Sequence, residues 1–260
     1  MEISGDSSLN ILIPLFENKE MAIRVLKSAI AFKKLQLSYN VNIIVSDDSK
    51  DRHLEVFLKT IDLYKNECIF ISRENKINEV NAAVYNWNFL LSYSYKLNDT
   101  SHYMLLHHDE EICLNSSSEF SLNSELIILP LIGIARRRNN LLGILLFKYF
   151  IVHHPKLLYC FNIIGPCGCF INNQKMYFNT NLKWLVDVDF YLRIINKLVN
   201  RKKSITLNSN CSIKTYDNDS SITSKIDVSK ILIEETRKIK IGQPYFFINY
   251  LLSIYKNRNL

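Results

Sequence analysis

The chain contains few of the residues that interrupt regular structure. Only six glycines and five prolines occur among 260 residues, which argues against long disordered segments. Hydrophobic residues make up 48% of the sequence, enough to form a sizeable buried core. This length fits one large domain, so we expect a single folded unit over residues 1–260.

Cysteine pairs with metal-site spacing are missing. None of the six cysteines forms a Cys-x-x-Cys pair, so the sequence lacks zinc-site spacing. Cys68 lies in an apolar run, where a buried free thiol is the expected role. Residues 1–8 are polar and acidic, unlike a secretory signal peptide. We therefore expect a protein of the reducing cytoplasm.

No run of 18 apolar residues occurs either. The longest candidate, residues 141–152, is interrupted by Lys148 and is too short to span a bilayer. The aromatic segment 245–260 carries Lys256 and Arg258 near its end. It fits two structures: an amphipathic segment lying on the inner leaflet of a membrane, or a helix packed on the core.

The chain is basic, with a formal net charge of +7. Nucleic acid, an anionic membrane surface and phosphate-bearing substrates are all compatible with this charge. The two basic clusters, at 136–138 and 201–203, accompany no nucleic-acid motif, and we interpret them as solvated turns. We therefore expect no nucleic-acid partner.

Strand and helix patterns alternate through the first 111 residues. Apolar runs predict strands at residues 9–15, 41–45, 68–71 and 103–106. Helical spacing predicts helices at 17–35, 54–61 and 80–91. This βαβαβαβ order predicts an α/β fold with a parallel sheet. Because parallel strands end at one edge of a sheet, the polar residues that follow them should lie together.

No glycine-rich phosphate loop follows the first strand. The turn at residues 14–18 reads Pro-Leu-Phe-Glu-Asn, which argues against a dinucleotide-binding dehydrogenase and against a P-loop NTPase. A diphosphate bound here would need a metal ion and side chains to neutralise it.

The fourth predicted strand ends in a cluster of metal-binding side chains. Residues 107–111 read His-His-Asp-Glu-Glu. Oxygen ligands of this kind suit Mg²⁺ or Mn²⁺, and through the ion a diphosphate. A solvated acidic turn is the alternative interpretation.

The second half of the sequence is less regular. A strand is predicted at 126–135, a helix or buried strand at 141–152, and a strand pair around Gly165-Pro166 at 161–171. A strongly amphipathic helix is predicted at 184–199, with Asp187 and Asp189 near its start. Residues 204–224 look irregular or β, and a charged helix is predicted at 226–241.

Six motifs, taken in order, resemble those of the GT-A glycosyltransferases. They are Ile-Pro-Leu-Phe-Glu-Asn at 13–18, Val-Ser-Asp-Asp-Ser at 45–49, Arg73, Asn-Trp-Asn at 86–88, Leu-His-His-Asp-Glu at 106–110, and the acidic segment at 184–193. The order resembles the inverting family 2 of bacterial polysaccharide, O-antigen and capsule synthesis, over roughly residues 9–200. The resemblance implies a Rossmann-like, mostly parallel central sheet flanked by helices. It also implies a nucleotide-sugar-binding half at 9–111 and an acceptor-side half at 112–260.

The resemblance also implies roles for individual residues. Asp187 is the expected catalytic base, and Asp189 is the second choice. The expected metal ligands, for Mn²⁺ or Mg²⁺, are Asp109 and Glu111. The expected donor-binding residues are Pro14, Phe16, Glu17, Asp47, Asp48, Arg73, His107 and His108.

Some of these positions depart from the family pattern or have another explanation. His107 replaces the first aspartate of the DxD motif, and histidine ligates Mn²⁺ better than Mg²⁺. Either Asp109 alone holds the metal through water, or His107 or Glu111 assists, and metal dependence should be weak. Asp47 also fits an Asx turn. Arg73 also fits an exposed surface position, and Phe16 a core position.

The implied reaction is inverting sugar transfer. A nucleotide-diphosphate sugar, with UDP favoured, would donate to a hydroxyl of a saccharide acceptor, in particular a lipid-linked one at the inner face of the bacterial inner membrane. Two alternatives stay open. One is a nucleotidyltransferase, and the other is a non-catalytic, basic RNA- or polysaccharide-binding protein of degenerate GT-A fold.

Overall fold

The computed structural model describes most of the chain in several segments. These are residues 8–36, 38–73, 81–97, 102–114, 121–133, 154–159, 168–208, 210–216, 231, 234–235 and 238. The predicted segments 141–152 and 245–260 lie outside the described residues, as do most of 161–171 and 226–241.

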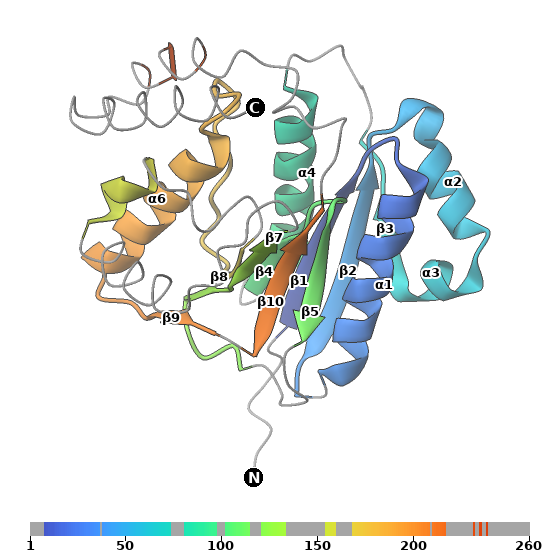
Figure 1. Ribbon diagram of the computed structural model, residues 1–260, viewed down its shortest axis with the longest axis horizontal. Helices are drawn as coiled ribbons and strands as arrows, with labels where there is room; N and C mark the ends of the chain where they lie inside the picture. Colours follow the sequence, from blue (N-terminus) through green and yellow to red (C-terminus); the bar gives the residue numbers. More distant parts are fainter. Residues whose placement is uncertain are drawn as a thin grey trace.

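A seven-stranded sheet forms the centre of the molecule, with strand order β3-β2-β1-β4-β8-β6-β9 (Figure 1). Its strands are β1 (Ser8–Leu15), β2 (Asn40–Asp47), β3 (Cys68–Ile71), β4 (His102–Leu105), β6 (Leu126–Ile128), β8 (Cys169–Asn172) and β9 (Ile205–Leu207). The first four strands are parallel, as predicted. The strand β8 runs antiparallel to both of its neighbours, and β9 is parallel to β6.

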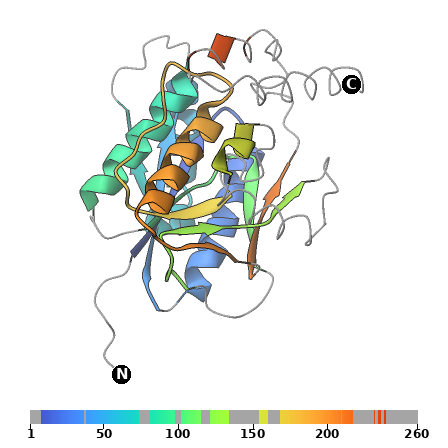
Figure 2. The ribbon, with the colours of Figure 1, turned by 90° about the vertical axis from the view of Figure 1, so that its left-hand side faces the viewer.

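Apolar layers cover both faces of this sheet, which explains why β1 is buried along its whole length. On one face lie α1 (Lys19–Leu35), α2 (His53–Lys59) and α3 (Asp62–Glu67). On the other lie α4 (Ala82–Leu97) and α6 (Val186–Asn200), in front of the strands in Figure 2. The pattern predicted one helix where α2 and α3 form two.

Local signals explain where the long helices begin and what they bury. The Asn18 side chain caps α1 by accepting a hydrogen bond from the Met21 N–H at 3.1 Å. The predicted apolar stripe of α6 is buried, as the side chains of Val188, Tyr191 and Ile195 show. Of the helices in the described segments, none is both long and apolar enough to cross a membrane.

A small second sheet, ordered β5-β10-β7, packs against the face that carries α1. Its strands are β5 (Glu110–Leu114), β10 (Cys211–Thr215) and β7 (Leu131–Gly133). Short 3₁₀ turns also occur at Lys50–Arg52 and Pro155–Tyr159. Glu110 and Glu111, for which a solvated acidic turn was the alternative interpretation, are the first residues of β5.

The predicted strand at 126–135 is a wrong prediction, because the chain changes sheets within it. The strand β6 ends at Ile128 and β7 begins at Leu131 in the other sheet. Pro130 lies between them and has no N–H to continue a ladder, while its carbonyl accepts from the Ile213 N–H at 2.9 Å. The fold class itself is confirmed: a mostly parallel central sheet lies between layers of helices.

Candidate active site

The carboxyl ends of β1 to β4 bring the predicted donor-binding residues to one edge of the sheet. Pro14 is buried in β1 and lies opposite Ser46 of β2. The Asp48 N–H donates to the Leu15 carbonyl at 3.0 Å, so the chain leaving β2 is tied to the end of β1. Residues that are 30 or more positions apart in the sequence are therefore neighbours at this edge.

Asp47 shapes the turn after β2. Its Oδ1 accepts the Ser49 N–H and its Oδ2 accepts the Glu55 N–H, both at 2.8 Å. The side chain is buried. These bonds form the Asx turn that was the alternative explanation for Asp47, and they also fix the first turn of α2. A nucleobase contact from Asp47 stays a prediction.

Arg73 and Asp48 form an ion pair at the same edge. The Arg73 Nη2 lies 3.4 Å from the Asp48 Oδ2, and the two side chains are only 11% and 8% exposed. The alternative of a surface position for Arg73 is therefore wrong. A nearly buried guanidinium beside a strand end suits recognition of a phosphate or a base edge.

Phe16 and Glu17 form the tight turn after β1. Phe16 is 47% exposed as a residue, so the alternative of a core position is wrong, and a base could stack on its ring. Glu17 has a positive φ of 52°, and its carboxylate accepts the Lys50 N–H at 2.8 Å. This hydrogen bond links the turn after β1 to the turn after β2.

Two histidines and an aspartate follow β4. Burial lowers the pKa of His107 to about 4, although the nearby Asp109 carboxylate opposes the shift. Burial also lowers the pKa of His108, again against the effect of Asp109. Both imidazoles are therefore neutral at pH 7, the form in which histidine can ligate a metal.

Glu110 and Glu111 point to opposite sides of β5, as strand alternation requires. Glu110 is buried and closes the turn, accepting the His107 N–H at 3.2 Å. The Glu111 Oε1 lies 3.8 Å from the Arg24 Nε, and the Tyr216 hydroxyl donates to its Oε2. Glu111 is thus engaged by α1 and by the residue after β10, and its role as a metal ligand stays a prediction.

The donor set at this edge fits a metal that the protein holds only in part. Within the described segments, no three His, Cys, Asp or Glu side chains are grouped to hold a metal ion. One carboxylate, from Asp109, with neutral His107 and His108 beside it, suits an ion whose other ligands are diphosphate oxygens and water. Weak metal dependence stays a prediction.

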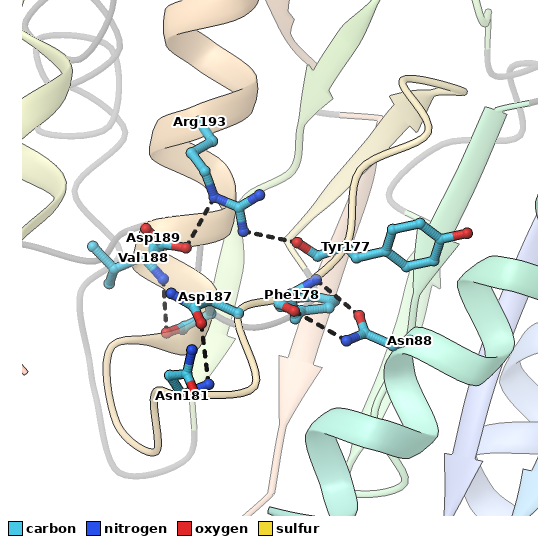
Figure 3. A network of polar contacts seen from close by, with 9 residues as sticks. Asn88, Tyr177, Phe178, Asn181, Asp187, Val188, Asp189 and Arg193 are labelled. Carbon is cyan, nitrogen blue, oxygen red and sulfur yellow. Dashed lines mark hydrogen bonds and ion pairs between the residues drawn. The ribbon is translucent and has the colours of Figure 1, made fainter. Parts of the chain in front are cut away.

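Asp187 and Asp189 diverge at the start of α6 (Figure 3). Asp189 is buried, and its Oδ2 accepts from the Arg193 Nε at 2.9 Å. Arg193 also donates to the Tyr177 carbonyl at 2.8 Å. Asp187 is only partly buried, and its Oδ1 accepts the Val188 N–H at 2.9 Å. Asp189 thus holds Arg193 in place, Asp187 is engaged by the backbone of its own helix, and the assignment of Asp187 as the base stays a prediction.

The helix α4 connects the end of β4 to the segment before α6. The Trp87 ring lies 4.7 Å from the His107 ring and 5.1 Å from the Phe178 ring, between centroids. Phe178 stacks on Phe190 of α6 at 4.0 Å. Asn88 exchanges two hydrogen bonds with the Phe178 backbone, at 2.8 and 3.0 Å (Figure 3). His107 after β4 and Phe178 thus flank one indole ring, and Phe178 in turn packs on Phe190 of α6.

Glu235 is a site residue that the sequence patterns missed. The α6 cap residue, Leu185, has no side-chain cap bond. The buried Glu235 carboxylate instead accepts the N–H groups of Lys183, Trp184 and Leu185, the last at 2.8 Å. The nearest local signal is a charged helical pattern, which does not reveal a partner about 50 residues away.

Two buried polar atoms lie near the same edge. The Ser46 Oγ and the Asn86 Oδ1 have no hydrogen-bond partner within the segments that the structure describes. Ser46 is the next-to-last residue of β2, and Asn86 lies on α4 beside Trp87. An unsatisfied buried polar atom costs about 1–3 kcal/mol, so each one calls for an explanation, such as a catalytic role or a bound water or ion.

Comparison with known proteins gives similarity in structure more than in sequence. No protein-family profile matches the chain. The β″ subunit of DNA-directed RNA polymerase from Euglena longa is 31% identical over 98 residues, covering 35% of this chain and 12% of that subunit. A likeness over so short a stretch does not assign the chain to the polymerase family.

Three solved structures share the architecture. TarS from S. aureus has a TM-score of 0.52 and 13% identity over 88% of this chain, which spans 40% of that structure. TarS residues 1–349 have a TM-score of 0.54 and 14% identity, over 88% of this chain and 65% of that one. The Pyrobaculum calidifontis mannosyltransferase PcManGT was solved with GDP-Man and Mn²⁺. It has a TM-score of 0.52 and 10% identity, over 96% of this chain and 71% of that chain. The chain therefore has a GT-A-like glycosyltransferase fold.

Proposed function

We propose that the protein is an inverting glycosyltransferase. It would move a sugar from a nucleotide-diphosphate sugar, with UDP favoured, to a hydroxyl of a saccharide acceptor. The observation that supports this proposal is the position of the Trp87 ring, which contacts His107 after β4 and Phe178 in the segment before α6, because the proposal needs Asp109 and Asp187 to lie at one site. A transferase needs both: a place for the leaving diphosphate and a base for the acceptor hydroxyl.

Each group has a defined task in this proposal. Arg73 and the exposed ring of Phe16 bind the nucleotide. Asp109, with neutral His107 beside it, would hold Mn²⁺ or Mg²⁺, which when bound stabilises the charge on the departing diphosphate. Asp187 accepts the proton of the acceptor hydroxyl, and Asp189 holds Arg193 and thereby the segment before α6.

Two observations favour nucleotide-sugar binding at this edge. The buried Ser46 and Asn86 oxygens lie near the predicted donor residues, where ligand groups would satisfy them. The structurally similar PcManGT was solved with GDP-Man and Mn²⁺, a ligand pair of the kind proposed for this chain.

A donor panel tests the proposal. Calorimetry with Mn²⁺ would measure binding of UDP-, GDP- and dTDP-sugars to the full chain. We expect one nucleotide class to bind, and nucleotide release to follow on adding acceptor or, slowly, on hydrolysis. Binding of a nucleoside triphosphate together with a sugar phosphate would favour a nucleotidyltransferase. Binding of RNA or polysaccharide with no nucleotide sugar bound would favour a binding protein.

The acceptor and the location are also part of the proposal. A lipid-linked saccharide in bacterial surface polysaccharide synthesis would place the protein at the inner face of the membrane. The net charge of +7 suits an anionic leaflet. Pelleting the full chain with anionic vesicles and with neutral vesicles tests this location, and equal recovery in the two pellets would contradict it.

A further inference from the structure

A cavity of about 370 Å³ lies at the end of the main sheet where β4 begins, opposite the end that carries Asp109. Its walls include the end of β8 and the end of α6. Asn172 of β8 pairs with His102, the first residue of β4, which is about 13 Å along the strand from Leu106. The far end of α6 is roughly 20 Å from Asp187. The cavity is therefore separate from the proposed transfer site.

Positive charge dominates this cavity. Its lining includes four cations, Lys175, Lys197, Arg201 and Lys203, and one carboxylate, Glu125. The Glu125 Oε1 lies 3.3 Å from the Lys203 Nζ, and its Oε2 accepts from the Gln174 side chain at 3.4 Å. One acidic group is thus compensated within the wall, while three further cations line the same space. The basic cluster 201–203, predicted to be a solvated turn, supplies two of the four.

Stabilisation of the α6 C-terminus does not account for this charge. Cations are favourable near helix carboxyl ends, but the carbonyls here already have backbone partners. The N–H groups of residues 201–203 donate to the carbonyls of residues 197–199 at 3.0–3.3 Å, which closes the last turn of the helix. The Lys197 ammonium instead donates to the Gln174 carbonyl at 3.2 Å, and Lys175 comes from a different segment.

The polar lining suits a sugar that carries a negative charge. Carboxamides of Asn172, Asn173 and Gln174 lie among the cations, and amides can donate to and accept from sugar hydroxyls. Lysine and arginine bind carboxylate or phosphate groups through charge-assisted hydrogen bonds. The space is open to solvent, and its volume is large enough for a single sugar unit.

We propose that this cavity is a second, non-catalytic site that binds an anionic saccharide through one carboxylate or phosphate group. On the proposed glycosyltransferase function, its ligand would be a charged unit of the acceptor chain, held away from the hydroxyl that receives the sugar. Binding at the cavity itself requires no transfer reaction, so it can be measured independently.

Calorimetry on the full chain at low salt would test the site with four probes: glucose 6-phosphate, glucuronic acid, inorganic phosphate and glucose. We expect one of the two anionic sugars to bind, and glucose to bind at least tenfold more weakly. The double substitution Lys197→Gln with Arg201→Gln should weaken that binding about 10- to 100-fold. Lys202→Gln is the matched control, because Lys202 is exposed and adjacent but does not line the cavity, and it should change binding less than about twofold.

Several results would overturn the proposal. They are no preference for an anionic sugar over glucose, equal affinity for inorganic phosphate and the anionic sugar, or equal loss in the double variant and the Lys202→Gln control. Nucleotide-sugar binding, measured in the same proteins, should be unchanged by the double substitution. If the wild-type protein binds the anionic sugar but binds no nucleotide sugar, the transferase function is rejected and the proposal of this second site stands.

Discussion

The two ends of the proposed active site are built in different ways. At the end of β4 the backbone is fixed by the parallel ladder, as the Leu106 N–H donating to the Leu12 carbonyl at 2.9 Å shows. At the start of α6, and in the segment before it, side chains from distant segments hold the backbone: Asn88 at Phe178, Arg193 at Tyr177 and Glu235 at residues 183–185. The strand end can be predicted from local patterns, whereas the helix start depends on contacts that local patterns do not encode.

The largest effect should come from the base at the helix start. Replacing Asp187 with asparagine removes the proton acceptor, so we expect sugar transfer to fall by about 10²- to 10⁴-fold. Donor affinity should stay within about twofold of wild type. Initial rates and calorimetry on the same preparation measure the two quantities. Wild-type turnover by Asp187→Asn would show that the base assignment is wrong.

Asp189→Asn sharpens the contrast between the two aspartates. It removes the ion pair with Arg193 and leaves the Asp187 carboxylate unchanged. We therefore expect a loss of folding stability, with a smaller loss of transfer than in Asp187→Asn when both are assayed well below their melting temperatures. A larger loss of transfer in Asp189→Asn would reverse the assignment.

The next prediction concerns the remote carboxylate that completes α6. Glu235→Ala leaves three backbone N–H groups without their acceptor, so the free energy of unfolding should fall by about 2–3 kcal/mol. Urea unfolding measures this change. Glu234→Ala is the matched control, because Glu234 is the exposed helical neighbour, and its effect should stay within about 0.5 kcal/mol. Equal effects of the two substitutions would show that Glu235 does not stabilise the start of α6.

A smaller effect is expected at the strand end. Asp109→Ala should weaken donor binding about tenfold with Mn²⁺ present and change it little with EDTA. Calorimetry under both conditions measures the difference. Glu20→Ala, on the exposed side of α1, is the control for the loss of one negative charge. Unchanged affinity of Asp109→Ala with Mn²⁺ would count against the metal role.

The smallest effect concerns pH. Burial lowers the pKa of His102 below its usual 6.5, although its hydrogen bond to the Ser124 carbonyl opposes the shift. Below pH 6.5 the unfolded chain therefore binds a proton that the folded chain does not, so stability should fall as the pH drops. His102→Gln removes this contribution. Urea unfolding at about pH 7.5 and about pH 5.5 should show a smaller pH dependence for the variant, and an unchanged dependence would contradict the assignment.

The contrast between the two ends also explains which features could be predicted from the sequence and which could not. Strands β1 to β4 and the burial of Cys68 follow from apolar runs, because both faces of the parallel part of the sheet are covered. The Arg73–Asp48 pair joins two strand ends, so the sheet order explains its closeness. Glu111 shows the limit: its partner Tyr216 is 105 residues away, directly after a strand of the second sheet. No spacing rule predicts such a pairing from one sequence.

The division of residues 126–135 between two sheets could not be predicted for a similar reason. The apolar character of the segment is the same in both sheets, and only Pro130 marks the crossing. A proline at an edge position or at the start of a strand is common enough that it does not by itself predict a change of sheet. The partners that distinguish the two strands, β8 and β10, are both distant in the sequence.

The most direct test of the account is whether an ion at the strand end lies close to the start of α6. In ¹⁵N-labelled protein with a bound nucleotide sugar, paramagnetic Mn²⁺ should broaden the amide resonances of Asp187 and Val188. It should leave that of Asn200, roughly 20 Å away at the other end of the helix, much less affected. Asp109→Ala should restore the broadened signals. Sharp Asp187 and Val188 resonances with Mn²⁺ and donor bound would contradict the claim that the two ends form one site.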